Sequence, residues 1–449
     1  MSTVLAPAPP RSDLVPIPGN HGLPIVGYTA RYMRDPVALW RERYERYGPV
    51  SWFGGFGTRF VSALGPDACG AVLANRDRAF ANGDSWRHLI GPFFDRGLML
   101  LDFDEHMAHR RIMQQAFTTQ RLARYAEGLN TAIEAGLSGW RPRPDFRVYP
   151  ATKTLTLDLA TSIFMGGAEG TTRSQLDRMN KAFIDCVQAG TAIIRFPMPG
   201  GRWRRGLHGR AKLERFLRQY LPSRRADNGD DLFSALCQAE SDDGQRFSDD
   251  DIISHMIFLL MAAHDTSTIT ISTMMSYLGQ HPEWQQRCRE ESLALDAYPD
   301  HDQLAHLESL DMVMKEAMRL VTPLPTMARN AVKDTEVLGH FVPQGSFVVA
   351  TPIFTHHMPE YWPEPERFDP GRFAPDRRED KVHRYAWQPF GGGVHKCLGM
   401  HFSTVEVKLV MHHLLRRFTW GVPPDYRAPM DYTSLPFPKD GHPVDLRAR

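Results

Sequence analysis

The hydrophobic and polar positions of this chain follow two periods. The middle of the sequence, together with segments 35–47 and 400–417, is predicted to be helical. Shorter runs, rich in β-branched and aromatic residues, are typical of strands. The first two of these runs predict a hairpin, and the full set is residues 50–53, 59–64, 327–332 and 346–351. The pattern predicts a mostly α-helical protein with a minor β region.

One long helix is predicted to be buried on every side. Ser248 precedes three aspartates, which is the combination of an N-cap and an acidic first turn. The following residues are apolar around the whole circumference, as in a core helix. The pattern ends before Pro282, and the helix is too polar in its middle to cross a membrane.

The polar stretch 264–268 lies in the middle of this helix, where unpaired polar groups are costly. Its serine and threonines can hydrogen-bond to carbonyl groups four residues earlier and bend the helix. The stretch has two interpretations. It is an internally satisfied polar patch, or it is a groove that holds water and relays protons.

Composition places limits on the class of protein. The chain has 449 residues, so one large domain or two lobes are expected. A hydrophobic content of 42% and a charged content of 23% are typical of a soluble globular protein, and a formal charge of +1 does not favour nucleic acid. Residues 1–30 form a Pro-rich N-terminal segment without an apolar anchor, so no membrane span is expected. Residues 31–449 are predicted to form one domain.

The five cysteines are scattered and form no Cys-x-x-Cys pair, so zinc is not expected. Their odd number in a long chain favours a reducing, cytoplasmic compartment. Cys397 differs from the others because it follows Gly391–Gly393 and precedes the predicted helix 400–417. The glycines let the backbone approach a flat, bulky group, and the helix start favours the thiolate. A thiolate on such a loop suits a haem iron. The alternative is a buried structural cysteine beside a glycine turn.

The run from Phe390 to Gly399, with the spacing Phe-x-x-Gly-x-His-x-Cys-x-Gly, resembles the haem-ligand signature of the cytochrome P-450 superfamily. The resemblance implies the cytochrome P-450 fold, one triangular domain with a large helical lobe and a small β-containing lobe. It also implies haem b (iron protoporphyrin IX) as the cofactor and Cys397 as its metal ligand. Phe390, Gly391 and Gly399 are expected to be cofactor-binding residues.

The polar stretch of the long helix carries a second likeness. Ala262 to Ser267 resembles the superfamily's oxygen-activation motif, in which Asp265 feeds protons and Thr266 is the alcohol that hydrogen-bonds to dioxygen or its water. Ala262 is expected to lie against the cofactor. The chain departs from the pattern at Ala263, where glycine is usual, and the added methyl could narrow the oxygen groove.

Three charged residues resemble the superfamily's Glu-Arg-Arg triad, which locks the loop before the cysteine. Glu316 and Arg319 share one face of a predicted helix, and Arg367 lies in Pro-Glu-Arg-Phe. A surface ion pair is the alternative for the first two residues. Their order before the Cys397 motif favours the triad.

Cations are required to bind the two haem propionates. The resemblance assigns His395 and Arg329 to this task, together with His106 and Arg110, which lie at i and i+4 on one helix face. The alternative for the last two residues is a solvated basic helix face.

The segments that correspond to the walls of the family's substrate pocket are apolar, which suits an adaptable cavity. The residues expected there are Phe93, Leu98, Met99, Phe196, Phe258, Met261, Leu324 and Leu435. A lipophilic substrate of sterol, terpenoid or fatty acyl type is therefore expected.

The sequence predicts a soluble, bacterial-type haem-thiolate monooxygenase. It would insert one atom of O2 into a C–H bond, with electrons from an external ferredoxin or flavodoxin and its reductase, and act as a monomer. Two alternatives stay open: a peroxide-driven peroxygenase on the same fold, and a haem-binding sensor without turnover. The Asp265–Thr266 pair argues against the first, because known peroxide users tend to lack this acid–alcohol arrangement, and a sensor has little need for a proton relay.

Overall fold

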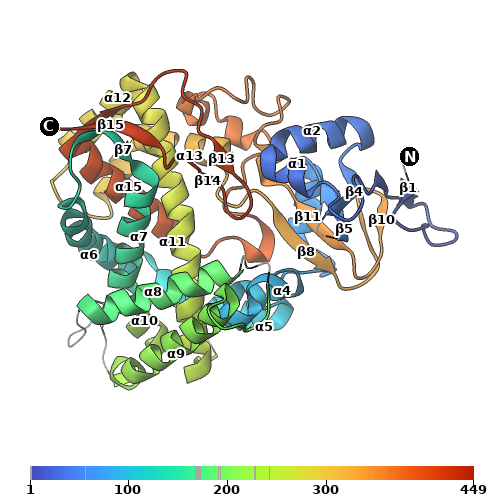
Figure 1. The fold of residues 1–449 in the computed structure, drawn as a ribbon, viewed down its shortest axis with the longest axis horizontal. Helices are drawn as coiled ribbons and strands as arrows, with labels where there is room; N and C mark the ends of the chain where they lie inside the picture. The colour runs from blue at the N-terminus through green and yellow to red at the C-terminus, as the bar shows by residue number, and fades with distance from the viewer. Residues whose placement is uncertain are drawn as a thin grey trace. The chain divides into compact units, whose positions relative to one another are not determined.

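The structure is a computed structural model, and it describes residues 3–55, 57–166, 173–190, 192, 194–226, 229–241 and 243–449. The chain divides into two compact units. The first, called the β unit here, contains most of the strands. The second, the helical unit, contains most of the long helices (Figure 1). The β unit is 1–85, 312–397 and 427–440, and the helical unit is 86–311, 398–426 and 441–449.

A seven-stranded sheet organises the β unit, with the strand order β1-β3-β4-β5-β11-β8-β6. The predicted hairpin is confirmed, since β4 (Val50–Gly55) pairs antiparallel with β5 (Thr58–Ala63). β5 then pairs in parallel with β11 (Phe347–Ala350), which pairs antiparallel with β8 (Met327–Ala331). The last two strands agree with the prediction to within about one residue.

The remaining strands of the β unit are short. They complete the main sheet, a three-stranded sheet of order β2-β10-β9, and the β13-β14 pair. Their bounds are β1 (Thr3–Val4), β2 (Val15–Pro16), β3 (Pro18–Asn20), β6 (Phe80–Ala81), β9 (Thr335–Val337), β10 (His340–Val342), β13 (Met430–Asp431) and β14 (Phe437–Pro438).

Capping residues determine where the best-defined helix of the β unit begins and ends. α2 (Pro36–Tyr47) starts at Asp35, whose side chain accepts a hydrogen bond from the Ala38 N–H at 2.9 Å, and ends at Gly48 with φ of 79°. The other helices of this unit are α1 (Thr29–Arg34), α3 (Pro66–Ala74) and α14 (Pro352–Thr355), while α4 (Gly83–Phe94) and α13 (Glu308–Leu320) contain a boundary between the units.

The predicted long helix is α11 (Asp249–Gln280), the core of the helical unit. Ser248 is the N-cap, and its hydroxyl accepts from the Asp251 N–H at 3.2 Å. α11 packs against α7 (Val148–Met165), α9 (Arg202–Ala226) and α15 (Met400–Arg417), and Figure 1 shows it in yellow among them. Among the described residues it alone is long and apolar enough to span a membrane, but 72% of that window is buried, as in a core helix.

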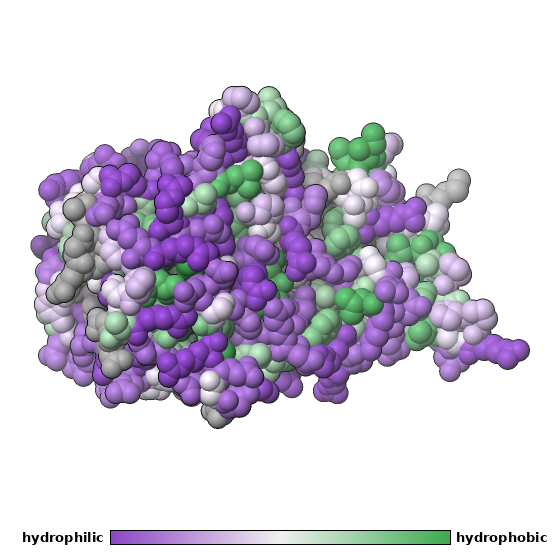
Figure 2. Space-filling model, turned by 90° about the horizontal axis from the view of Figure 1, so that it is seen from below, coloured by the Kyte–Doolittle hydropathy of each residue, from purple (hydrophilic) through white to green (hydrophobic). Residues whose placement is uncertain are grey.

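The other elements of the helical unit surround α11. The helices are α5 (Phe103–Gln114), α6 (Thr119–Leu137), α8 (Arg173–Gly190), α10 (Leu232–Gln238) and α12 (Pro282–Ala294), and a three-stranded sheet joins β12 (Phe418–Gly421), β15 (Pro443–Ala448) and β7 (Arg143–Arg147). Figure 2 shows mostly hydrophilic residues on one face of the molecule, with small separate apolar groups. The mostly α fold with a minor β region is confirmed.

Candidate active site

Cys397 ends a tight loop of the β unit, residues 388–397, called the cysteine loop here. The Gly391 N–H donates to the Gln388 carbonyl at 3.0 Å, and the Cys397 N–H donates to the Phe390 carbonyl at 2.9 Å. Gly391 and Gly393 have φ of 70° and 63°, in the left-handed region that favours glycine. The sequence therefore determines a closed turn that holds the cysteine backbone.

The cysteine loop lies flush against α3. A Cβ atom at Gly393 would lie 1.8 Å from the Leu73 carbonyl oxygen, and one at Gly392 would lie 2.7 Å from the Tyr385 ring. Any side chain at these two positions would push the loop outward. The glycines therefore fix how far Cys397 projects.

Cys397 is exposed, whereas the other four cysteines are buried. Burial raises the pKa of the Cys186 and Cys237 thiols to about 12. It also raises the pKa of Cys69 and Cys288. Thiols in such environments stay protonated and are poor metal ligands. Among the five cysteines, Cys397 is therefore the accessible one.

A buried ion-pair cluster lies in the same unit. Arg319 and Glu316, on α13, are both fully buried and form two parallel hydrogen bonds of 2.7 and 2.9 Å. Glu316 also accepts from the Asp369 N–H at 2.9 Å, and Arg319 donates to the carbonyls of His356 and Pro365 at 2.8 and 2.7 Å. The alternative of a surface ion pair is therefore wrong, and these added bonds meet the requirement of buried charges for further partners.

The assignment of Arg367 to this cluster is wrong. Its guanidinium is 64% exposed and pairs with Glu364, and only its backbone carbonyl accepts from Arg319. Arg372, five residues later, is buried instead, 3.4 Å from Glu316 and 2.9 Å from Glu379. Arg372 completes the cluster because its side chain points into the β unit, where the buried carboxylate of Glu316 requires a positive partner.

The predicted propionate partners occur in both units. In the β unit, Arg329 on β8 is buried and donates to Asn82, while His395 is half-buried in the short helical turn before Cys397. In the helical unit, His106 and Arg110 both lie on α5, with His106 buried and Arg110 half-buried. Each unit therefore contains one arginine and one histidine of the set predicted to bind the haem propionates.

Thr266 and Asp265 lie on the less buried side of α11. The Thr266 hydroxyl donates to the Ala262 carbonyl at 2.9 Å, and Ala262 itself is exposed. The Asp265 carboxylate accepts a hydrogen bond from Lys153 Nζ on α7 at 2.7 Å and lies 3.3 Å from His264 Nδ1. Lys153 was not predicted, since nothing in its own segment indicates the partner.

The rest of the polar stretch is buried and paired. His264 contacts the Lys153 carbonyl at 3.1 Å, and burial lowers the pKa of its imidazole. Ser267 donates to Glu406 on α15 at 2.5 Å, and burial raises the pKa of that carboxyl to about 7. Thr268 lies 2.7 Å from the Thr156 hydroxyl. These three residues fit the internally satisfied patch.

The predicted pocket residues differ in exposure. Phe93 is fully buried against Trp203, with ring centroids 4.9 Å apart, and Phe196 is 67% exposed. Leu98 and Phe258 are buried, while Met99, Met261, Leu324 and Leu435 are half-buried. Phe196 and the half-buried residues are therefore those with surface left for a ligand.

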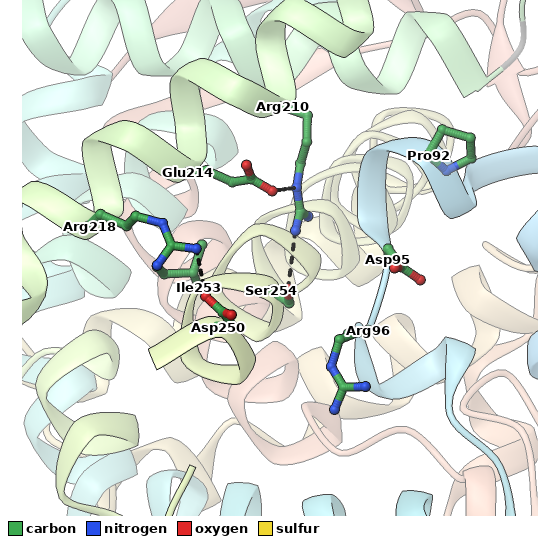
Figure 3. A pocket seen from close by; sticks show the side chains of 9 residues that line it. All are labelled: Pro92, Asp95, Arg96, Arg210, Glu214, Arg218, Asp250, Ile253 and Ser254. Carbon is green, nitrogen blue, oxygen red and sulfur yellow. Dashed lines mark hydrogen bonds and ion pairs between the residues drawn. The ribbon is translucent and has the colours of Figure 1, made fainter. Parts of the chain in front are cut away.

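A polar cavity of about 290 Å³ lies in the helical unit (Figure 3). Figure 3 shows Arg210 reaching Glu214 and Ser254, and Arg218 reaching Asp250. The cations that line it are paired with carboxylates and offer little net charge to a ligand. The Arg218–Asp250 pair and the Arg210–Ser254 hydrogen bond join α9 to α11.

The residues present fit a haem group on chemical grounds. The cysteine loop presents an exposed cysteine on a glycine backbone that lies close against its neighbours, as a flat ring requires. The exposed Ala262 gives α11 a small side chain between the half-buried Met261 and Ala263. No group of three or more His, Cys, Asp or Glu in the described part of the chain could hold a metal ion by itself.

Comparisons with known proteins agree with this chemistry. The family model described as "Cytochrome P450" matches residues 17–442. A cytochrome P450 numbered 136, from Mycobacterium tuberculosis, is 48% identical over 99% of this chain and 91% of its own length. A taxane 10-beta-hydroxylase from Taxus cuspidata is 26% identical over 98% of this chain and 91% of its own length.

A solved structure is also similar. Retinoic-acid-bound cyanobacterial CYP120A1 has a TM-score of 0.82 and 28% sequence identity, covering 96% of this chain and 99% of its own. The similarity extends over both units of the fold.

Proposed function

The chain belongs to the cytochrome P450 family and is a haem-containing monooxygenase, and from this premise we propose that Cys397 is the thiolate ligand of the haem iron. The observation that carries the proposal is the exposure of this one sulfur on a loop whose glycines permit close approach. When bound, the haem supplies oxygen activation, and a thiolate ligand favours cleavage of the O–O bond.

Haem b would be held by the residues that the resemblance assigns to it. Phe390, Gly391 and Gly399 would contact it around the cysteine, and Ala262 would contact it from α11. The donors that suit its propionates are His106, Arg110, Arg329 and His395, because carboxylates require charge-assisted hydrogen bonds. The Glu316–Arg319–Arg372 cluster would stabilise the region that holds the cysteine loop. The proposed domain is residues 31–449, after the Pro-rich segment 1–30.

Asp265 and Thr266 would be the catalytic residues. The Thr266 hydroxyl already donates to Ala262, so its oxygen remains an acceptor that orients a donor toward α11. Asp265 is bound by Lys153, whose side chain is 38% exposed. In this proposal, a proton from solvent would pass along Lys153 and Asp265 on its way to Thr266. This arrangement favours a dioxygen-driven enzyme over a peroxide-driven one or a sensor.

The substrate proposed is a lipophilic small molecule of sterol, terpenoid or fatty acyl type, hydroxylated at a C–H bond. Two similar proteins support this class, since one is named for a taxane and the other binds retinoic acid. The half-buried Met99, Met261, Leu324 and Leu435 would contact it, with Phe93, Leu98, Phe196 and Phe258 as the wider wall. Titration with such compounds should shift the Soret band if they enter.

An external ferredoxin or flavodoxin with its reductase would supply electrons. Arg111 and Lys396 are exposed cations that suit an acidic partner. The enzyme would work as a monomer in the cytoplasm.

The first experiment is the visible spectrum of the reduced protein under carbon monoxide. Wild type should show a strongly red-shifted Soret band, which Cys397→Ala and Cys397→His should lack. Lys396→Ala, at the exposed neighbouring position, is the matched control and should keep the band. Haem bound without this band in fresh wild-type protein would refute Cys397 as the ligand.

A further inference from the structure

His356 is a fully buried histidine that follows α14 in the β unit. Both nitrogens of its ring have defined partners. Nδ1 lies 2.7 Å from Oγ1 of Thr322, and Nε2 lies 2.9 Å from the backbone nitrogen of Gln388.

These partners determine the tautomer of His356. The Gln388 N–H can only donate, so Nε2 must accept, and the proton of the neutral ring lies on Nδ1. Nδ1–H then donates to Thr322, whose hydroxyl donates in turn to the Arg319 carbonyl at 3.4 Å. Burial, followed by the charges of His357 and Arg319, lowers the pKa of His356 well below its ordinary value. The ring is neutral at physiological pH.

The ring joins two parts of the β unit. On one side, Arg319 donates to the His356 carbonyl at 2.8 Å, which fixes the histidine to the buried ion-pair cluster. On the other side, Gln388 begins the cysteine loop, and its carbonyl accepts from Gly391 at 3.0 Å. His356 thus connects the cluster to the first residue of the turn that ends at Cys397.

We infer that His356 is a positioning residue for the thiolate, and that its neutral ring fixes the start of the cysteine loop to the Glu316–Arg319–Arg372 cluster. The inference rests on the proposed ligation by Cys397. Loss of the Nε2 acceptor leaves the Gln388 N–H buried without a partner, which costs more than the bond itself contributed. The loop then moves to find another acceptor, and Cys397 moves with it.

Two variants separate the two nitrogens. In His356→Gln the side-chain amide reaches the former Nε2 position, so its oxygen can still accept from Gln388. In His356→Asn the shorter amide reaches only the former Nδ1 position, so it can still donate to Thr322 but leaves Gln388 without an acceptor. Thr322→Val removes the hydroxyl, leaves the Nε2 acceptor in place and has nearly the same volume.

The measurements are the red-shifted Soret band of the reduced protein under carbon monoxide, the rate at which that band is lost, the melting temperature, and hydrogen–deuterium exchange across residues 388–391. His356→Asn should lose the band at least about tenfold faster than His356→Gln. It should also exchange faster in the loop, including in the haem-free protein. Thr322→Val should stay close to His356→Gln. If His356 had a merely structural role, the variants would lower the melting temperature, but their rates of band loss would not follow this order.

Equal rates of band loss in His356→Asn and His356→Gln, at matched melting temperatures, would overturn the inference. If His356→Asn does not fold, Thr322→Val decides, since band loss at least about tenfold faster than in the wild type, with the Nε2 acceptor intact, would show that the Nε2 contact is not the determinant. Absence of the band from wild type would instead refute the ligand proposed above.

Discussion

Replacing Arg372 by methionine tests the buried cluster directly. The change removes one guanidinium and keeps an unbranched side chain of similar length. In the wild type this group is 1% exposed, lies 3.4 Å from Glu316, and donates to Glu379 and to the Glu364 carbonyl at 2.9 Å each. Its loss leaves the carboxylates in excess inside the unit.

The size of the effect follows from burial. Removing one member of a buried, hydrogen-bonded charge cluster costs about 3–5 kcal/mol, because the remaining charge is left uncompensated. Arg367→Met is the matched control in the same segment. Its guanidinium and its partner Glu364 are 64% and 72% exposed, so this change should cost about 0–1 kcal/mol.

Urea unfolding, followed by far-ultraviolet circular dichroism, measures both variants. Arg372→Met should unfold at a clearly lower urea concentration with an unchanged slope, whereas Arg367→Met should overlap with the wild type. The carbon monoxide spectrum should show partial loss of the red-shifted band in Arg372→Met only. Equal destabilisation of the two variants, or an Arg372→Met protein within about 1 kcal/mol of the wild type, would refute the assignment of Arg372 to the cluster.

Three further predictions concern other parts of the molecule. Burial raises the pKa of Glu406 to about 7, so between about pH 4.5 and 7 the carboxyl is protonated in the folded protein and ionised in the unfolded chain. The free energy of unfolding should therefore fall by about 3 kcal/mol over this pH range, relative to Glu406→Gln. Parallel pH–stability curves of the two proteins would contradict this. Gly393→Ala should lose the red-shifted band because its Cβ would lie 1.8 Å from the Leu73 carbonyl oxygen, whereas Gly421→Ala, with nothing within 4 Å, should retain it. Thr266→Ala should keep the band but consume electrons without matching product, and tight coupling would exclude its proposed role.

Much of the fold could be predicted because its signals are local. Ser248 as N-cap, Pro282 as a stop and Gly391 at positive φ each act within a few residues, and the structure places α11 and the cysteine loop accordingly. The choice between the two arginines was not local. Pro-Glu-Arg-Phe and Pro-Gly-Arg-Phe follow each other within nine residues, and both offer an arginine before a phenylalanine. Only tertiary burial distinguishes them, by directing Arg372 toward Glu316 and Arg367 toward solvent.

Local sequence was also insufficient for the polar stretch of α11, where each of the two interpretations applies to different residues. A helix places successive side chains about 100° apart, so five adjacent polar residues must face different neighbours. Ser267 donates to the buried Glu406 on α15, and Thr268 lies against the buried Thr156 hydroxyl on α7, which makes both part of the core. Asp265 meets the partly exposed Lys153, and Thr266 faces the side where Ala262 is exposed. The sequence alone could not divide the stretch, because the partners that divide it lie more than 100 residues away. A satisfied core patch and a more exposed face, the one proposed to carry protons, therefore lie on successive residues of one helix turn.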